Sequence, residues 1–283
     1  MSLNSAASFL LDHASSVQCG LFILIFAAGW CAEKIVHTQN AATKLRHTGF
    51  NLAFLALVTP IQLVLIAGCL GVAEWVTLHR WGLVYFIPGT HNIWIRYGVT
   101  FLMLDFLDYA YHYIAHRVPA FWRLHLVHHS DEAVDVSTTF REHPAETAIR
   151  VGFLTLWVFI CGASVPVLIL RQTAETFANV SQHMTFRLPP RAARIVGWLF
   201  VTPNLHHMHH HCRLPGTNCN YGDVFSIWDR LFGTYAMPTE EIVFGIDSHM
   251  GRGVSTSFGG LLGINAARRA LQRPSFAASK ASS

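Results

Sequence analysis

Residues 93–116 read IWIRYGVTFLMLDFLDYAYHYIAH, an apolar segment long enough to cross a bilayer, with two histidines near its end. Four polar residues follow one another at intervals of three, four and four, so a helix places them on one face: Asp105, Asp108, His112 and His116. Acidic residues inside a membrane helix are costly unless they are paired or functional. We expect Asp108 to orient a histidine of a polar site at the end of this helix. For Asp105, the same role and a helix–helix hydrogen bond fit equally well.

Two further histidine clusters follow this first pair. The second has the form HxxHH and spans residues 125–129, the third lies within residues 206–211, and His183 stands alone between them. Spacings of three and four residues put the imidazoles of a cluster on one helix face. Histidine is the commonest metal ligand at neutral pH. Because one zinc ion takes about four ligands, eight or nine converging histidines predict two metal ions.

The third cluster can be read in two registers. Either His206, His209 and His210 or His207, His210 and His211 satisfy the HxxHH spacing, and spacing alone does not choose between them. His143, in the sequence Arg-Glu-His-Pro, is a candidate for a supporting role. The scattered histidines are expected to have no metal-binding role: His13, His37, His47, His79, His91 and His249.

The composition is that of a membrane protein, with a mean hydropathy of +0.35 and only 13% charged residues. Four apolar stretches approach the roughly 20 residues that a spanning helix needs. No signal peptide is evident, because the first stretch lacks a basic segment before it. The stretches are Val17–Ala32, Phe50–Val76 with a possible kink at Pro60, Ile93–Ala115 and Ile149–Leu170. We therefore expect an all-α integral membrane protein with about four to five membrane helices.

The fourth stretch is expected to form a helical hairpin. Ile149–Ala163 is too short to cross the hydrocarbon core at helical rise. Ser164-Val165-Pro166 then indicates a turn, and a second helix runs from Val167 to about His183. This hairpin is required to bring His183 to the side of the membrane where the other histidines lie.

Basic residues predict the orientation in the membrane. The loop after the first helix carries Lys34, Lys44 and Arg46, so the positive-inside rule makes it cytoplasmic. The histidine clusters are then expected in a cytoplasmic, histidine-lined helical cap. An amphipathic piece within 188–203 is expected to lie in the interface plane or to pack on this cap. We divide the chain into N-terminal membrane helices and outer loop (1–92), a catalytic domain (93–240) and a partly disordered tail (241–283).

Charge and cysteine content exclude other classes. The net charge of +4 is too small to indicate nucleic acid binding. Six cysteines occur without regular spacing, so we expect free thiols rather than a disulfide framework or a structural zinc site.

Several motifs resemble the fatty acid hydroxylase/sterol desaturase superfamily. The resemblance runs from about residue 95 to 235, with the motifs in the family's order. The motifs are HxxxH at His112–His116, FWRLHLVHHSD at Phe121–Asp131, REHP at Arg141–Pro144, the segment Pro203–His210, NYG at Asn220–Gly222 and WDRLFGTY at Trp228–Tyr235.

The resemblance implies a site. The family has a proline three residues before the first ligand of the last cluster, so Pro203 selects the register that starts at His206 and leaves His207 where the family often has arginine. Members with ten ligands carry a further HxxxH, of which this chain has His183 but Asn179 in place of the first histidine. The implied ligands are His112, His116, His125, His128, His129, His183, His206, His209 and His210, with Asn179, Asp108, His143 and His207 as further or supporting groups.

The resemblance also implies an activity. It indicates an integral-membrane di-iron centre that uses O2 to hydroxylate a fatty-acyl, sterol-like or other membrane lipid. Desaturation of a sterol-type lipid and ether-lipid monooxygenation are the alternatives, and a non-catalytic metal-binding membrane protein is a remote one. No flavin, haem or iron–sulfur motif is present, so electrons would come from a separate ferredoxin, cytochrome or reductase. Nitrogen-rich coordination also suits zinc, copper or nickel, but catalytic zinc keeps about three protein ligands.

Overall fold

The fold is helical throughout the residues that the computed structural model describes, which are 14–36, 40–238, 241–246 and 257–263. Within these ranges extended backbone pairs only as two isolated bridges, Phe200 with Phe225 and His211 with Phe244. The prediction of an all-α protein is thus confirmed for the described part of the chain. His13, His37, His249 and the tail beyond residue 263 lie outside it.

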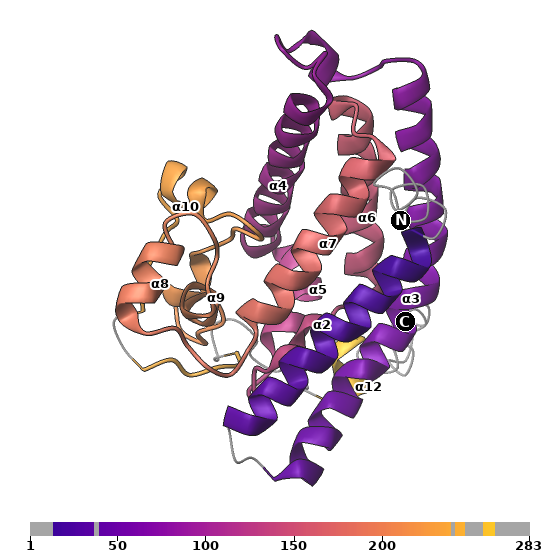
Figure 1. Ribbon diagram of the computed structural model, residues 1–283. Coiled ribbons are helices and arrows are strands. Elements are labelled where there is room, and N and C mark those ends of the chain that lie inside the picture. The colour runs from indigo at the N-terminus through magenta and orange to yellow at the C-terminus, as the bar shows by residue number, and fades with distance from the viewer. Residues whose placement is uncertain (1–13, 37–39, 239–240, 247–256, 264–283) are drawn as a thin grey trace, which may run out of the picture.

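Long helices form the body of the molecule (Figure 1), and the short helices α8, α9 and α10 lie together on one side of it. The long helices are α2 (Ala14–Val36), α3 (Ala41–Leu78), α4 (Ile93–Arg117), α6 (Pro144–Cys161) and α7 (Val165–Gln182). The short ones are η1 (Leu83–Phe86), α5 (Pro119–His129), η2 (Val136–Phe140), α8 (Pro190–Val196), α9 (Pro203–His209), η3 (Gly216–Asn218), α10 (Ile227–Leu231) and α12 (Phe258–Leu261). Helix α3 continues through Pro60.

Three described segments are long and apolar enough to cross a membrane: Ser16–Ile35, Ala41–Phe86 and Pro144–Cys161. The protein is therefore a membrane protein. The third segment corrects an expectation, because the short stretch predicted to begin at Ile149 begins five residues earlier at Pro144 and is 18 residues long. Proline is favoured at the first position of a helix, where its missing N–H costs nothing. Helix α4 does not reach the same hydropathy, since it carries Asp105, Asp108 and its histidines.

The expected return of the chain after α6 is confirmed. Gly162 ends α6 with a positive φ of 81°, and α7 starts three residues later. A side chain at Gly82 could not be accommodated here, because its Cβ would lie 2.3 Å from the backbone nitrogen of Gly162. Helix α6 packs mainly on α3 and α4, whereas α7 packs on α2 and α4. The return places His183, at the end of α7, 3.2 Å from His128 between their Nε2 atoms.

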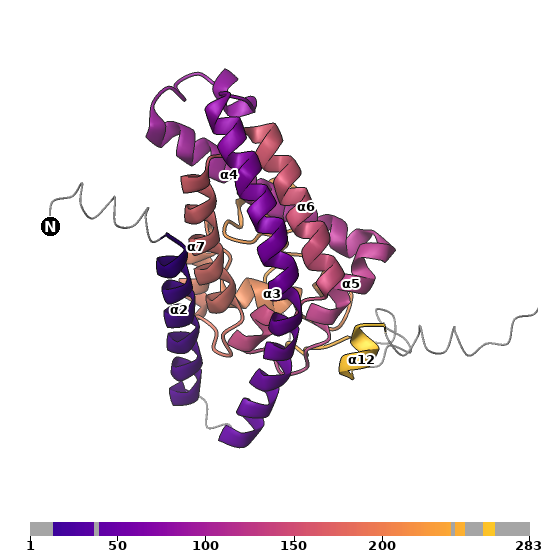
Figure 2. The same cartoon turned by 90° about the vertical axis from the view of Figure 1, so that its right-hand side faces the viewer.

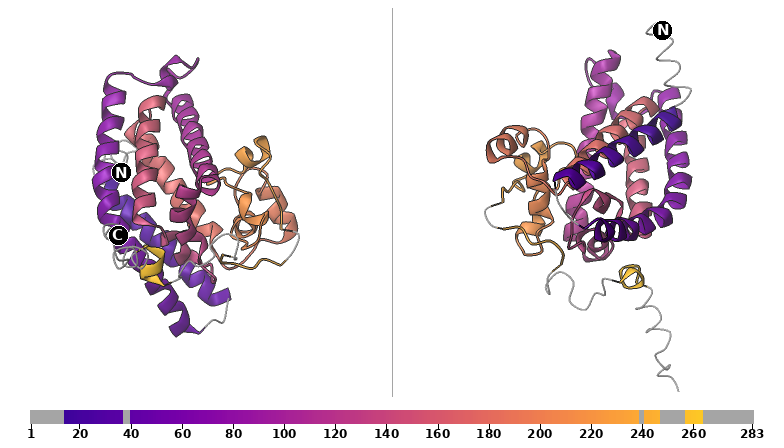
Figure 3. Two further views of the ribbon diagram at one scale, coloured as in Figure 1. Left: turned by 180° about the vertical axis from the view of Figure 1, so that it is seen from behind. Right: turned by 60° about the horizontal axis from the view of Figure 1, so that its bottom comes forward.

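The short helices surround the end of the bundle where α4 and α7 finish. Figures 1 and 3 both show α8, α9 and α10 beside this end. Figure 2 shows α12 on another side, near α5, where Phe258 packs on Phe54 of α3 with ring centroids 4.6 Å apart. Helix α8 is only seven residues long. The apolar side of the amphipathic piece predicted within 188–203 is exposed at Ile195, in α8, and at Trp198, just after it.

A buried charged network joins α2, α3 and the segment after α5. Lys44, which the sequence suggested for a cytoplasmic loop, lies inside α3 and is 3% exposed. Its Nζ lies 2.6 Å from Glu33 and 3.4 Å from Asp135. His47 of α3, for which no role was predicted, contacts Asp131 at 2.8 Å and Asp135 at 3.2 Å. Burial opposes ionisation of Asp131, but the contact with His47 outweighs it and holds the pKa of Asp131 below its ordinary value.

Replacing Lys44 by Met should lower the free energy of unfolding by about 3 kcal/mol or more, because two buried carboxylates would lose their cation. Lys34→Met is the matched control, since Lys34 is exposed on the neighbouring helix α2, and it should change the value by less than about 0.5 kcal/mol. Denaturant unfolding in detergent, followed by tryptophan fluorescence, measures both. Equal stability of the two variants would contradict a stabilising role for the network.

Candidate metal centre

Nine histidines converge at the end of the bundle. They form one group of five and one of four, and within each group the candidate ligand atoms lie within 4.8 Å of one another. Helices α4, α5 and α9 supply most of them. The other two, His183 and His210, are the residues that follow the last turns of α7 and α9. The five-histidine group is His112, His116, His125, His129 and His209, and the four-histidine group is His128, His183, His206 and His210.

The two groups cut across the sequence motifs. The second cluster sends His125 and His129 to the five-histidine group but His128 to the other. In the third cluster, His206 and His210 stay together while His209 crosses over. Residues four apart on a helix point in nearly the same direction, whereas those one apart diverge by about 100°. Each HxxHH motif can therefore serve two neighbouring metal positions at once.

The ring nitrogens approach one another as closely as ligands of a single ion. Nε2 of His112 lies 3.1 Å from Nε2 of His125. In the other group, Nε2 of His206 lies 3.0 Å from that of His183 and 3.1 Å from that of His210. Two nitrogens bound to one metal at about 2.0–2.1 Å and at right angles to each other would be about 3 Å apart. These separations fit coordination to a shared ion.

Several of these imidazoles lack a hydrogen-bond partner within the described chain. His129 is fully buried, and neither of its nitrogens has a partner. The same holds for Nε2 of His209 and Nδ1 of His210. Burying polar atoms without partners is costly. A metal ion would use lone pairs such as these, so the residues present fit a metal centre.

Burial keeps the imidazoles neutral, as metal binding requires. It lowers the pKa of His125 and of His183 to about 4. For His129, burial and the neighbouring histidines hold the pKa well below its ordinary value. At neutral pH these rings therefore keep a free lone pair.

Acceptors behind the rings orient four of the nine histidines. Three outer Nδ1 atoms face backbone carbonyls: His112 faces that of Tyr221 at 3.0 Å, His183 that of Asn179 at 2.7 Å and His209 that of Cys219 at 2.8 Å. The fourth, Nδ1 of His125, faces Oε1 of Glu146 at 2.7 Å. A carbonyl can only accept, so Nδ1 carries the proton and Nε2 is left to bind a metal.

Glu146 performs the task that was predicted for Asp108. Asp108 instead binds the guanidinium of Arg171 on α7, with Nε 3.0 Å from Oδ2. That prediction is wrong, because the Asp108 carboxylate meets a cation on a neighbouring helix. Asp105 likewise makes contacts between elements, since its carboxylate accepts from the Trp228 indole at 2.7 Å. Glu146 was missed because an acid in the first turn of a helix is common for its interaction with the helix dipole alone.

The remaining candidates lie outside the two groups. The His143 ring caps α6 by accepting from the N–H of Ala145 at 3.0 Å, so its predicted supporting role is wrong. His207 packs against Phe244 and accepts from Arg187 at 3.3 Å. The side-chain amide of Asn179 donates to Asp223 at 2.9 Å, while its backbone carbonyl serves His183. The register that starts at His206 is the one that the structure gathers with the other histidines.

The cysteines take no part in either group. All six are free thiols, as expected. Cys219, next to the third cluster, directs its Sγ to the carbonyl of Gly216 at 2.8 Å.

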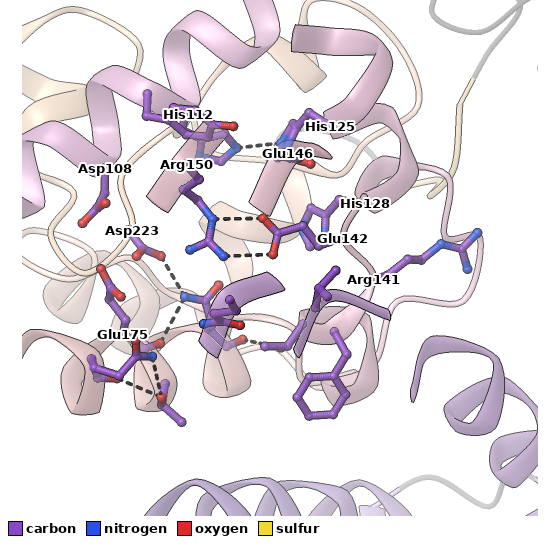
Figure 4. Close-up of a pocket in the computed structure, with 18 of the residues that line it drawn as sticks. Asp108, His112, His125, His128, Arg141, Glu142, Glu146, Arg150, Glu175 and Asp223 are labelled. Carbon is purple, nitrogen blue, oxygen red and sulfur yellow. Dashed lines mark hydrogen bonds and ion pairs between the residues drawn. The ribbon is translucent and has the colours of Figure 1, made fainter. Parts of the chain in front are cut away.

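A polar cavity of about 230 Å³ opens beside the histidines (Figure 4). Its wall includes His112 and His125 from one group and His128 and His206 from the other. Charged, polar and apolar side chains line the rest. Figure 4 shows Arg150 held by two bonds to Glu142, at 3.0 and 2.9 Å. A substrate in this cavity would lie against both histidine groups.

Comparison with known proteins places these residues in a family. Residues 97–234, which include all nine histidines, match the family model described as fatty acid hydroxylase. The chain is 30% identical over 137 residues to an ornithine lipid hydroxylase of Rhizobium tropici, which covers 48% of this chain and 40% of that protein. It is 28% identical over 156 residues to the alkylglycerol monooxygenase of Homo sapiens, or 54% of this chain and 33% of the relative.

A cholesterol 25-hydroxylase-like protein of Danio rerio is 26% identical over 148 residues, covering 52% of this chain and 58% of the relative. The chain thus matches less than two thirds of the length of these relatives. No solved structure matches. Residues 97–234 form a fatty acid hydroxylase domain, and through it the chain belongs to the fatty acid hydroxylase/sterol desaturase superfamily that its histidine motifs indicated.

Proposed function

We propose that the protein is an O2-dependent lipid hydroxylase with a di-iron centre. The observation that carries this proposal is the division of nine histidines, seven of them buried, into adjacent groups of five and four at the end of an apolar helical bundle. Each group supplies more nitrogen ligands than the about three that catalytic zinc keeps. Iron is a metal that imidazole-rich sites suit.

The five-histidine group would hold one iron and the four-histidine group the other. Bound iron supplies the activation of O2 that attack on an unreactive C–H bond needs. The chain's own residues position the rings through the carbonyls of Tyr221, Asn179 and Cys219 and the carboxylate of Glu146. The cavity beside them holds the lipid carbon and keeps it in place.

The overall reaction defines what must be delivered to the site. A C–H bond, O2, two electrons and two protons yield an alcohol and water. We propose that the electrons come from a separate ferredoxin, cytochrome or reductase. We also place the site on the cytoplasmic face, because Lys34 and Arg46 are exposed near the α2–α3 connection. That connection lies at the histidine end, since Glu33 accepts from the N–H of Thr185 at 2.8 Å.

The names of the relatives support a lipid substrate and are compatible with two reactions, lipid hydroxylation and ether-lipid monooxygenation. Their names include a lipid hydroxylase and several alkylglycerol monooxygenases. Ether-lipid monooxygenation is therefore the second candidate, since it begins with hydroxylation of the carbon next to the ether oxygen. Desaturation remains an alternative outcome that would use the same ligands.

The proposed activity is tested by lipid analysis under ¹⁸O2. Cells that express the protein should accumulate a lipid that has gained one ¹⁸O atom, and cells that express His128→Ala should not. Loss of two hydrogens without oxygen would instead indicate desaturation, and release of a fatty aldehyde would indicate ether cleavage. A lipid profile that matches the His128→Ala cells in all these respects would refute an oxygenase function.

The Fe(II) affinities of variants at His209 and at its neighbour His207 should show which of the two histidines binds the metal. His209→Ala should lower the affinity for Fe(II) by more than about tenfold, because even the loss of an outer contact to a ligand costs that much. His207→Ala should leave the affinity unchanged. Competition with a coloured chelator on purified protein measures both. A greater loss in His207→Ala would mean that the other register of the third cluster binds the metal.

Glu146→Gln should weaken iron binding by about tenfold or more, because a neutral amide oxygen is a weaker acceptor for the Nδ1–H of His125 than the carboxylate and leaves the ring less basic toward a metal. Glu142→Gln is the matched control, since Glu142 lines the same cavity but binds Arg150 rather than a histidine. The same chelator competition applies, with circular dichroism to verify the helical content. Unchanged affinity in Glu146→Gln would show that His125 needs no carboxylate.

A further inference from the structure

A second cavity adjoins the polar one and is of opposite character. It has a volume of about 370 Å³ and lies between α2 and α3, where Ile23, Phe26, Ala27 and Leu52 are among its apolar walls. Three residues line both cavities, namely Phe22, Leu55 and Phe140. The two cavities therefore adjoin each other at these apolar side chains.

The apolar cavity faces the bilayer. Its walls belong to the spanning segments Ser16–Ile35 and Ala41–Phe86. Ile23 is 64% exposed and Leu52 is 40% exposed, which on a membrane helix means contact with lipid. A hydrocarbon chain can enter this groove sideways from the membrane without meeting a charge.

The polar cavity suits a hydrocarbon chain less well than the groove does, because charged side chains stand among its apolar ones. Most of its carboxylates already have a cation or an imidazole beside them: Glu142 has Arg150, Asp108 and Glu175 have Arg171, and Glu146 has His125. Asp223 differs from these. Among the described residues its carboxylate accepts from the neutral amide of Asn179, at 2.9 Å, and forms no ion pair within 4 Å.

Another carboxylate in this cavity has an oxygen without a donor. Glu146 is 3% exposed, and its Oε2 has no hydrogen-bond partner within the described chain. Figure 4 shows Asp223 turned toward Asp108 and Glu175, whose oxygens lie within 4.8 Å of its own. Three carboxylates thus meet around one guanidinium, that of Arg171. The cavity needs a ligand that brings N–H donors and positive charge.

We propose that the lipid substrate binds headgroup first. The hydrocarbon chain lies in the groove between α2 and α3, and an amine-bearing headgroup enters the polar cavity, where Asp223 binds its ammonium. The carbon that reaches the histidines is then in the headgroup or next to it, rather than near the methyl end of the chain. This inference rests on the proposed lipid hydroxylase function and specifies the substrate class of that site.

The orientation is tested by photolabelling of the full chain in nanodiscs with a diacyl lipid that has an ethanolamine headgroup. One probe carries a diazirine at the end of an acyl chain, and the other carries it beside the amine. The chain-end probe should label residues 22–31 and 48–55, and the headgroup probe should label the cavity segments 139–150 and 172–179. Chain-end labelling of the cavity segments, or no difference between the probes, would overturn the proposal.

A pair of neighbouring alanines provides the control for the groove. Ala27 lines it, whereas Ala28 is exposed on the same helix and does not. Ala27→Trp should reduce chain-end labelling about tenfold, since the indole would occupy space in the groove that the hydrocarbon chain needs. Ala28→Trp should label like the wild type. Equal labelling of the two variants would contradict the groove as the chain site.

Asp223→Asn tests the headgroup contact. It should reduce labelling by the amine headgroup probe about tenfold, as the loss of a charge-assisted hydrogen bond predicts, and spare a probe with a glycerol headgroup. Retained chain-end labelling shows that the variant is folded. Equal effects on both headgroups would refute ammonium recognition. These readouts need neither iron nor O2, so failure to oxygenate a lipid would contradict the proposed function without affecting the binding result.

Discussion

The centre of this molecule depends on holding nine buried or half-buried imidazoles neutral and pointing them at common positions. Burial disfavours the charged ring, as the lowered pKa of His125 shows. Orientation comes from behind the rings, where the carbonyls of Tyr221 and Cys219 and the carboxylate of Glu146 take up the outer N–H groups. These acceptors come from α6 and from the segment after α9, so several distant parts of the chain must be in place before the two groups form. The irregular segment 211–226 is therefore part of the site rather than a connection.

Buried ion pairs serve as the framework around this centre. Lys44 with Glu33 links α3 to α2, and Arg171 with Asp108 links α7 to α4. A buried pair adds little net stability compared with apolar packing, but a partner left alone is very costly. Such pairs consequently penalise any arrangement that would separate their helices. In a bundle whose outer faces are uniformly apolar, this is a way to select one relative placement of α2, α3, α4 and α7.

The same charges shape what can approach the histidines. Apolar walls between α2 and α3 lead from the bilayer, and the space beyond Phe140 is lined by carboxylates and guanidinium groups. An amphipathic molecule fits these two spaces in one orientation, with its apolar part in the groove and its polar part in the cavity beyond. The family to which the domain belongs acts on lipids of several kinds, and the names of the relatives range from an ornithine lipid hydroxylase to a cholesterol 25-hydroxylase-like protein. Substrate choice within such a family is expected to depend on the walls of the cavity rather than on the histidines.

Local periodicity was sufficient to predict the helix that carries His112 and His116 and the all-helical fold, because spacing along one helix determines which side chains share a face. The superfamily was indicated by the resemblance of the sequence motifs. Three of the predicted apolar stretches correspond to described segments that are long and apolar enough to cross a membrane. Local periodicity was not sufficient where the partner lies on another element. Asp108 and Glu146 are both acids on helices near histidines, and only the distances between helices decide that the first meets Arg171 and the second His125. Lys44 reads as a loop cation, yet it is buried because α3 begins earlier than its apolar stretch. The tertiary structure likewise decided that His128 and His209 belong to different groups from their sequence neighbours. Which group a histidine joins depends on the direction in which its side chain leaves the helix and not on the motif that contains it.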